Sequence, residues 1–259
     1  MRGSGLVSLL LAAALVSGCA TQSGSTGSMQ DSEPKEAVEA YTGLGVQYLQ
    51  AGNTVNAKMS LQRALSIDAD YAPANNAMAL VFQVEQEYGL AEEYFRKGVA
   101  ADPDSAMLHN NFGAFLFARQ RYQEACVQLD LASRDPFYPQ RAQALENLGR
   151  CYLLIGRNTD AEEAFRRSLA INGNRYVALV ELSQLLLDRG EHAMASRYFE
   201  RFRQQVEQRQ VEHYPKSLWV GIQLARLDRN ASRAATYALL LKNMYPNSEE
   251  YRLYQESAQ

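Results

Sequence analysis

The residue types that most often do chemistry are few in this chain of 259 residues, and they form no recognisable catalytic or metal-binding motif. His109, His192 and His213 are isolated, without a second histidine or a cysteine at a spacing that suits zinc. Two carboxylate pairs, Glu92-Glu93 and Glu162-Glu163, occupy equivalent places of a repeated unit, which indicates a solvated helix face instead of acid–base catalysis. No nucleophile is matched with a base. We therefore expect no enzyme, no metal site, no cofactor and no small-molecule substrate.

Cys19 is the residue whose sequence context points to a definite modification. Residues 1–18 read as a signal peptide, because the apolar run from Leu6 to Val16 is too short to span a bilayer. The stretch Leu15-Val16-Ser17-Gly18-Cys19 resembles the lipobox of bacterial lipoproteins, which implies that Cys19 is lipidated and begins the mature chain. By the same resemblance, Ala20 implies sorting to the outer membrane of a Gram-negative bacterium, on its periplasmic face.

The segment after the signal peptide differs in composition from the rest of the chain. Thr21 to Glu33 is rich in Ser, Gly, Thr and Gln and has too little apolar surface to order itself. We interpret residues 19–34 as the lipidated cysteine and a flexible tether, followed by one folded domain over residues 35–259.

The other two cysteines, Cys126 and Cys151, would lie in an oxidising compartment. Cys126 opens the second helix of one predicted hairpin, and Cys151 lies late in the first helix of the next. Because these helices are antiparallel neighbours, the two cysteines lie at the same end and can form a disulfide. Both positions also suit a free cysteine, which usually behaves as a small buried apolar side chain.

The folded domain is predicted from a repeat of small and bulky residues. Tyr41, Leu44, Gly45 and Tyr48 match the helix-turn-helix pattern W-x-x-L-G-x-x-Y, and a second helix follows with a small residue at Ala57. The corresponding small residues are separated by 34, 34, 36, 34 and 40 residues: Ala57, Ala91, Ala125, Ala161, Ala195 and Ala235. A period of about 34 is typical of tetratricopeptide repeats. The sequence therefore predicts an all-α fold, a right-handed superhelical solenoid of about six such repeats.

The expected repeats cover 38–71, 72–105, 106–139, 142–175, 176–209 and 216–249, with a C-terminal cap helix at about 249–257. The sixth repeat is degenerate, with Trp219 and Ile222 on the pattern but Gln223 and Arg226 off it. A solenoid needs a cap because its last repeat otherwise exposes an apolar face.

Two insertions lengthen the connections between repeats. We expect Phe137 and Tyr138 to pack within an enlarged loop before the fourth repeat, the alternative being an exposed aromatic contact for a partner. The polar run from Arg201 to Gln210 is interpreted as a solvated helix extension, the alternative being a contact with an acidic surface.

By resemblance to tetratricopeptide proteins, the first helices line a concave groove that binds a partner. The lining mixes aliphatic and amide side chains, which suits an extended or helical peptide, and it lacks the basic cluster that would clamp a terminal carboxylate. An alternative for Leu49 and Leu80 is packing between repeats. The candidate partner-binding residues are Thr42, Val46, Leu49, Gln50, Asn76, Leu80, Gln83, Asn110 and Phe117, continued by Ala114, Glu146, Arg150 and Leu153.

Several segments narrow the resemblance beyond the repeat itself. They are the lipobox, Asn110-Asn111-Phe112-Gly113, Tyr138-Pro139 and Leu241-Lys242-x-x-Tyr245-Pro246. Together with the repeat number, they make the chain similar to the PilF/PilW lipoproteins of type IV pilus biogenesis. This resemblance implies a pilotin, which helps the secretin, the outer-membrane ring through which the pilus emerges, to reach the membrane and to form multimers.

Two other functions stay open at this point. One is a scaffold lipoprotein for another envelope machine, such as a cell-wall synthase activator or an outer-membrane protein assembly complex. The other is a catalytic periplasmic protein, which would need a convergent set of polar side chains. The net charge of −3 gives no electrostatic reason to expect nucleic acid.

Overall fold

The computed structural model describes residues 32–257, and it folds this part of the chain into helices without a strand. The predicted all-α class is therefore confirmed for these residues. Residues 1–31, with the predicted signal peptide, Cys19 and nearly all of the tether, lie outside the described part. The helices are α1 Ser32–Gln50, α2 Thr54–Ile67, α3 Ala72–Val84, α4 Tyr88–Ala101, α5 Ala106–Ala118, α6 Tyr122–Arg134, α7 Arg141–Leu154, α8 Asn158–Ile171, α9 Tyr176–Asp188, α10 His192–Glu207, α11 Pro215–Leu227, α12 Ala231–Met244 and α13 Glu249–Glu256.

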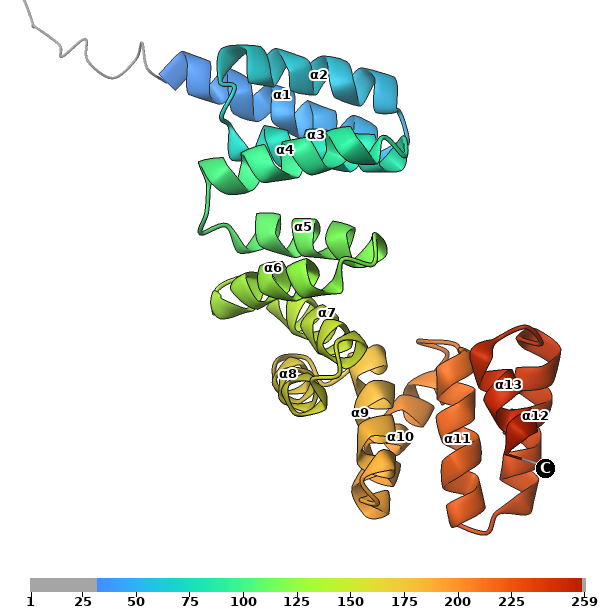
Figure 1. Cartoon of the computed structure of the whole chain (residues 1–259). Helices are drawn as coiled ribbons and strands as arrows, with labels where there is room; N and C mark the ends of the chain where they lie inside the picture. Colours follow the sequence, from blue (N-terminus) through green and yellow to red (C-terminus); the bar gives the residue numbers. More distant parts are fainter. Residues whose placement is uncertain (1–31, 258–259) are drawn as a thin grey trace, which may run out of the picture.

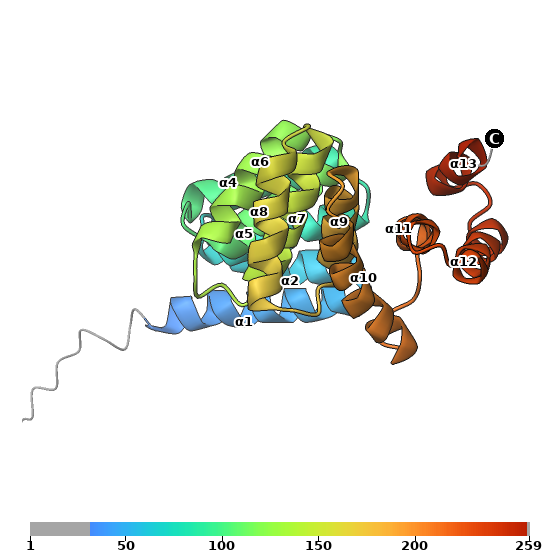
Figure 2. The ribbon, with the colours of Figure 1, turned by 90° about the horizontal axis from the view of Figure 1, so that it is seen from below.

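Successive helices pair as antiparallel hairpins, and each hairpin stacks on the next (Figure 1). The six pairs run from α1–α2 to α11–α12, and α13 packs on α11 and α12. The chain changes direction along the stack, because α11, α12 and α13 are seen end-on in the view that shows α1 lengthwise (Figure 2). Apolar side chains form three clusters in series, as expected for a solenoid in which each repeat contacts only its neighbours.

The small residues of the pattern allow the two helices of a hairpin to approach closely. A Cβ atom at Gly45 would lie 2.6 Å from Leu61 Cγ, and one at Gly149 would lie 2.6 Å from Phe165 Cε1. Leu61 and Phe165 are fully buried, so neither side chain has room to move away. The alanines of the second helices, Ala57, Ala91, Ala125, Ala161 and Ala195, are also fully buried.

The register expected for the sixth repeat is wrong by two residues. A Cβ at Gly221 would lie 2.8 Å from Tyr237 Cδ2, so these two residues repeat the close contact that the other hairpins make. Ala235 is exposed, and Leu239 is 59% exposed, whereas Tyr237 is 7% exposed. Arg233 takes the place that alanine holds in the other repeats. The missing alanine hid the true register, and Ala235 gave a false match.

The loop before α7 does not enclose both of its aromatic residues. Phe137 is 90% exposed, which corrects the expectation that it packs within the loop, whereas Tyr138 is partly buried. The Phe137 N–H donates a hydrogen bond of 2.8 Å to Asp135 Oδ1 in a local turn. The side chain of Phe137 therefore extends into solvent. Within residues 32–257, no helix has both the length and the apolar character needed to cross a bilayer.

Candidate partner-binding surface

In the first four repeats, the residue that follows the buried alanine of the second helix contacts the next repeat. Its contacts are Lys58–Glu85 at 2.8 Å, Glu92–Arg121 at 2.7 Å, Glu162–Arg189 at 2.6 Å, and the cysteine pair Cys126–Cys151. In the fifth repeat the same position is Ser196. These contacts fix the relative placement of neighbouring hairpins, and therefore the shape of the groove that the first helices line.

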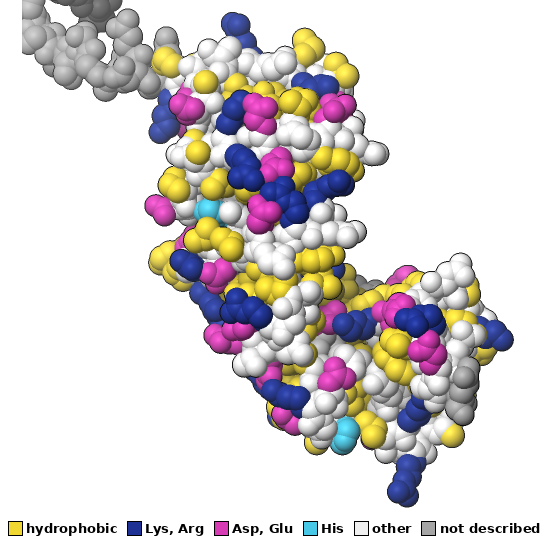
Figure 3. Space-filling model, in the orientation of Figure 1, with side chains coloured by type: hydrophobic (Ala, Val, Ile, Leu, Met, Phe, Trp, Pro, Cys, Tyr) yellow, Lys and Arg dark blue, Asp and Glu magenta, His cyan; other side chains and the backbone are white. Residues whose placement is uncertain are grey.

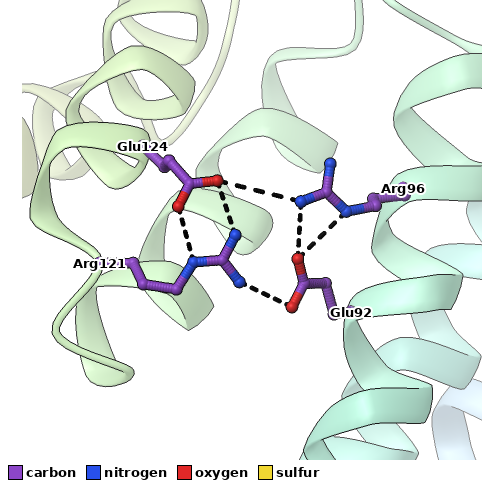
Figure 4. Close-up of polar contacts among 4 residues, drawn as sticks. All are labelled: Glu92, Arg96, Arg121 and Glu124. Carbon is purple, nitrogen blue, oxygen red and sulfur yellow. Dashed lines mark hydrogen bonds and ion pairs between the residues drawn. The ribbon is translucent and has the colours of Figure 1, made fainter.

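The contact between the second and third repeats is an ion-pair network of four side chains (Figure 4). Arg121 donates to Glu92 at 2.7 Å and to Glu124 at 2.6 Å, and Arg96 donates to Glu92 at 2.7 Å. The hydrogen bond from Arg121 holds the pKa of Glu92 below its ordinary value, although partial burial opposes this shift. Glu92 thus joins two repeats, so the expectation of a merely solvated face holds for its neighbour Glu93 but not for Glu92 itself.

The structure joins Cys126 and Cys151 by a disulfide, with Cα atoms 5.6 Å apart. Cys126 lies at the start of α6 and Cys151 near the end of α7, and both side chains are almost fully buried. Cys126 occupies the repeat position at which three other repeats carry an ion-paired residue.

The described histidines form no metal site. His109 is buried, with Nδ1 2.7 Å from Gln128 Oε1 and Nε2 2.8 Å from the carbonyl oxygen of Pro103. Within residues 32–257, no group of three His, Cys, Asp or Glu side chains is placed to hold a metal ion.

The nine candidate groove residues divide into two groups by exposure. Val46, Leu49, Leu80, Gln83 and Phe117 are partly exposed, and Gln50 is exposed. Val46, Leu49, Leu80 and Phe117 also pack against the apolar clusters with part of their surface. These six side chains form a mixed aliphatic, aromatic and amide surface, and the binding of a partner to it stays a prediction.

The other three candidates, Thr42, Asn76 and Asn110, are buried and have little surface to offer. Thr42 donates a hydrogen bond of 2.8 Å to the Val38 carbonyl, one turn earlier in α1. Asn76 Oδ1 accepts a hydrogen bond of 3.1 Å from Asn111 in the next repeat. Their positions on the first helices suggested groove residues, but Thr42 uses its hydroxyl within its own helix and Asn76 uses its amide between repeats.

Farther along the groove, side chains of successive first helices contact one another. The Arg150 guanidinium lies over the Phe117 ring at 5.1 Å, and Gln223 donates to Gln184 at 2.9 Å. The sequence analysis named groove residues only as far as the fourth repeat, so Gln184 and Gln223 were not among them. Figure 3 shows the molecule bent, with a hollow on the inner side where the C-terminal repeats turn.

Stacked helical hairpins with an open groove define the class of protein: a tetratricopeptide repeat scaffold that binds other proteins. In agreement, residues 38–71 and 104–172 match tetratricopeptide repeat family models. The type IV pilus assembly protein PilF of Pseudomonas aeruginosa is 39% identical over 247 residues, which cover 95% of this chain and 96% of that relative. The chain therefore belongs to the PilF/PilW family of type IV pilus assembly proteins, a family of non-catalytic scaffolds.

Solved structures agree with this assignment. A structure of Pseudomonas aeruginosa PilF has a TM-score of 0.78 at 40% identity, and the match covers 86% of this chain and 99% of that one. PilW, a widely conserved type IV pilus biogenesis factor, has a TM-score of 0.68 at 29% identity, covering 85% and 99%. An uncharacterised protein of Haemophilus influenzae is 28% identical over 62% of this chain and 87% of its own length.

Proposed function

We propose that this protein is a pilotin: an outer-membrane lipoprotein that binds the secretin subunit of the type IV pilus and promotes its localisation and multimerisation. The observation that carries the proposal is the match to PilF along nearly the whole chain. The lipobox ending at Cys19 supports the lipid anchor, and the partly exposed groove supports a protein partner.

The anchor and the groove would act together. Each buried CH₂ of an acyl chain contributes about 0.8 kcal/mol, so the chains attached at Cys19 hold the protein at the periplasmic face of the outer membrane. A secretin subunit bound in the groove is then confined near the bilayer and near other bound subunits. Such confinement raises the effective concentration and favours multimers without any catalytic step.

We place the main contact in the first repeat. α1 follows the tether directly, so this repeat lies nearest to the membrane on average. Val46 and Leu49 are partly exposed on α1, and Gln50 beside them is exposed. Aliphatic side chains next to an amide can anchor an apolar segment and bind its main chain.

The test replaces Val46 and Leu49 by Asp, which puts charge on the apolar part of the contact. Helical circular dichroism checks folding, and Gln62→Asp serves as the matched control because Gln62 is exposed on α2. We expect the control to form heat-resistant secretin multimers and the double variant to form few. Normal multimers in a folded double variant would remove the contact from the first repeat. If pull-down recovers a cell-wall synthase or an outer-membrane assembly protein and not the secretin, the pilotin proposal is wrong and the protein is a scaffold for that other machine.

A further inference from the structure

Three recurring positions on the first helices stack each repeat on the repeat before it. In α5 these positions are Leu108, Phe112 and Phe115. A Cβ atom at Gly98 of α4 would lie 3.1 Å from Leu108 Cδ2. The Phe95 ring, also from α4, lies 5.5 Å from the Phe112 ring and 5.3 Å from the Phe115 ring. The three positions therefore form the face on which the second helix of the preceding repeat packs.

In α1 the same positions are Ala40, Leu44 and Gln47, and no repeat precedes α1 within residues 32–257. All three are exposed, Leu44 to 39%. The residues equivalent to Leu44 are almost fully buried in the next four repeats: Met78, Phe112, Leu148 and Leu182. The terminal repeat of a solenoid normally has a polar outer face. α1 instead keeps the small and aliphatic residues of a repeat on which another helix packs.

Gly43 lies on the same side of α1, and nothing in the described chain explains it. It is exposed in the interior of the helix, and no atom of a neighbouring element lies within 4 Å of a Cβ atom built there. A glycine inside a helix is destabilising relative to alanine, so the position has a cost without a visible benefit. Glycine is of benefit where a second helix comes close, as Gly45 shows against Leu61.

The exposed residues on this side of α1 form a stripe that is symmetrical about the point between Gly43 and Leu44. The stripe, named here the α1 face, consists of Glu36, Ala40, Gly43, Leu44, Gln47 and, directly after the helix, Ala51. If two α1 helices lie antiparallel with a two-fold axis at that point, Leu44 of each copy meets Gly43 of the other. Ala40 then meets Gln47, so a larger side chain faces a small one throughout, as it does between the helices of a hairpin. Glu36 lies beside the start of α2 of the other copy, where the helix dipole favours a carboxylate.

Two other ways to cover the α1 face fit less well. Among residues 20–31, which come directly before α1, Met29 is the one large apolar residue, so this segment lacks an apolar side. A head-to-tail stack of copies would need a free face on the last repeat, but α13 packs on α11 and α12 there (Figure 1). Two-fold packing of α1 on α1 meets neither obstacle and closes the assembly at two copies.

We propose that the α1 face packs on the α1 face of a second copy of this chain, so that the protein forms a two-fold pair at the membrane. One helix from each copy buries less than a standard protein–protein interface of about 1,600 Å², so the contact is weak in solution. The lipid anchor of the proposed function, on which this step rests, confines both copies to one bilayer and raises their effective concentration.

Pairing leaves the candidate groove open. Val46 lies about 200° around α1 from Leu44, because successive residues of a helix are about 100° apart. Under the proposed function, a pair therefore holds two secretin subunits next to each other, which favours the first step of multimerisation.

The test is cysteine cross-linking of the full mature lipoprotein in phosphatidylethanolamine–phosphatidylglycerol vesicles that contain no secretin. One protein carries Ala40→Cys and the other Gln47→Cys, and air oxidation with a copper catalyst joins thiols that lie in contact. The two residues meet across the proposed axis, whereas position 40 of one copy lies about 10 Å along the helices from position 40 of the other. Cys126 and Cys151 are already bonded to each other and do not compete.

We expect the mixture of the two proteins to give about tenfold more cross-linked dimer than either protein alone, because a disulfide forms only at short range. Gly43→Ala in both proteins should lower the yield about tenfold, since its methyl group meets Leu44 of the other copy, while raising the melting temperature. Gly89→Ala is the matched control and should leave the yield unchanged. Gly89 is an exposed glycine of α4, and no atom of a neighbouring element lies within 4 Å of its Cβ position.

Equal yields from the mixture and from the separate proteins, or a yield that Gly43→Ala leaves unchanged, would overturn the inference. The pilotin function would still stand in that case, because the vesicles contain no secretin. Loss of secretin multimers in a Leu44→Asp strain, together with no cross-linking in the vesicles, would assign the α1 face to the secretin and exclude the second copy as its occupant.

Discussion

Gly45 and Gly43 lie two residues apart in α1, and replacing each by alanine separates packing from helix propensity. Nothing lies within 4 Å of a Cβ atom at Gly43, so Gly43→Ala should raise the free energy of unfolding by about 1 kcal/mol. A Cβ at Gly45 would lie 2.6 Å from Leu61 Cγ and 3.3 Å from the carbonyl oxygen of Ala57. Both neighbours belong to the buried part of α2, and overpacking such a contact costs about 1–3 kcal/mol.

The propensity gain is common to both substitutions, so the difference between the two variants isolates the packing cost. We expect Gly45→Ala to be less stable than Gly43→Ala by about 1–3 kcal/mol in urea unfolding followed by circular dichroism at 222 nm. In a thermal melt the same difference is about 2–4 °C per kcal/mol. Replacing Leu61 by alanine removes the atoms that clash, so the difference should close in that background. Equal stability of Gly43→Ala and Gly45→Ala in the protein that keeps Leu61 would refute the argument that close packing requires a small residue at position 45.

The remaining predictions concern the contacts between repeats and the exposed loop. Glu92→Gln should lower the free energy of unfolding at pH 7 by about 1 kcal/mol. Because the Arg121 contact lowers the pKa of Glu92, the wild type should be the more stable protein above pH 4.5 and should lose this advantage as the pH falls through the folded-state pKa of Glu92. Unfolding of both proteins measured across this pH range checks the prediction. Because Cys126 and Cys151 are bonded, alkylation of the unfolded, unreduced protein followed by mass spectrometry should find both cysteines unmodified, and reduction should cost about 3 kcal/mol of stability. Alkylated Cys126 and Cys151 in the unfolded, unreduced protein would contradict this. Phe137→Ser should change stability by less than about 0.5 kcal/mol, because the side chain makes little contact with the fold.

The sequence was sufficient for the fold because packing demands the same residue sizes in every hairpin. A tiny residue opposite a bulky one leaves a signal at about 34 residues that survives where the bulky residue changes from Leu61 to Phe165. The signal fails where a repeat departs from the rule at its most recognisable position. Arg233 in place of alanine did this in the sixth repeat, and the glycine at 221 was the signal that could have corrected the register.

The candidate surface was less predictable, because exposure depends on neighbouring repeats. Asn76 reads as a groove amide in its own helix, but Asn111 of the next repeat covers and binds it. The reverse holds for Phe137, whose apolar character suggested burial although the loop turns it outward.

The central claim is that the protein acts as a membrane-anchored scaffold for the secretin. The most direct measurement quantifies heat-resistant secretin multimers in outer-membrane fractions of a deletion strain, complemented with the wild type or with Cys19→Ala. The account predicts that deletion removes the multimers, that the wild type restores them, and that Cys19→Ala leaves few in the outer membrane. Wild-type levels of outer-membrane multimers in the deletion strain would contradict it.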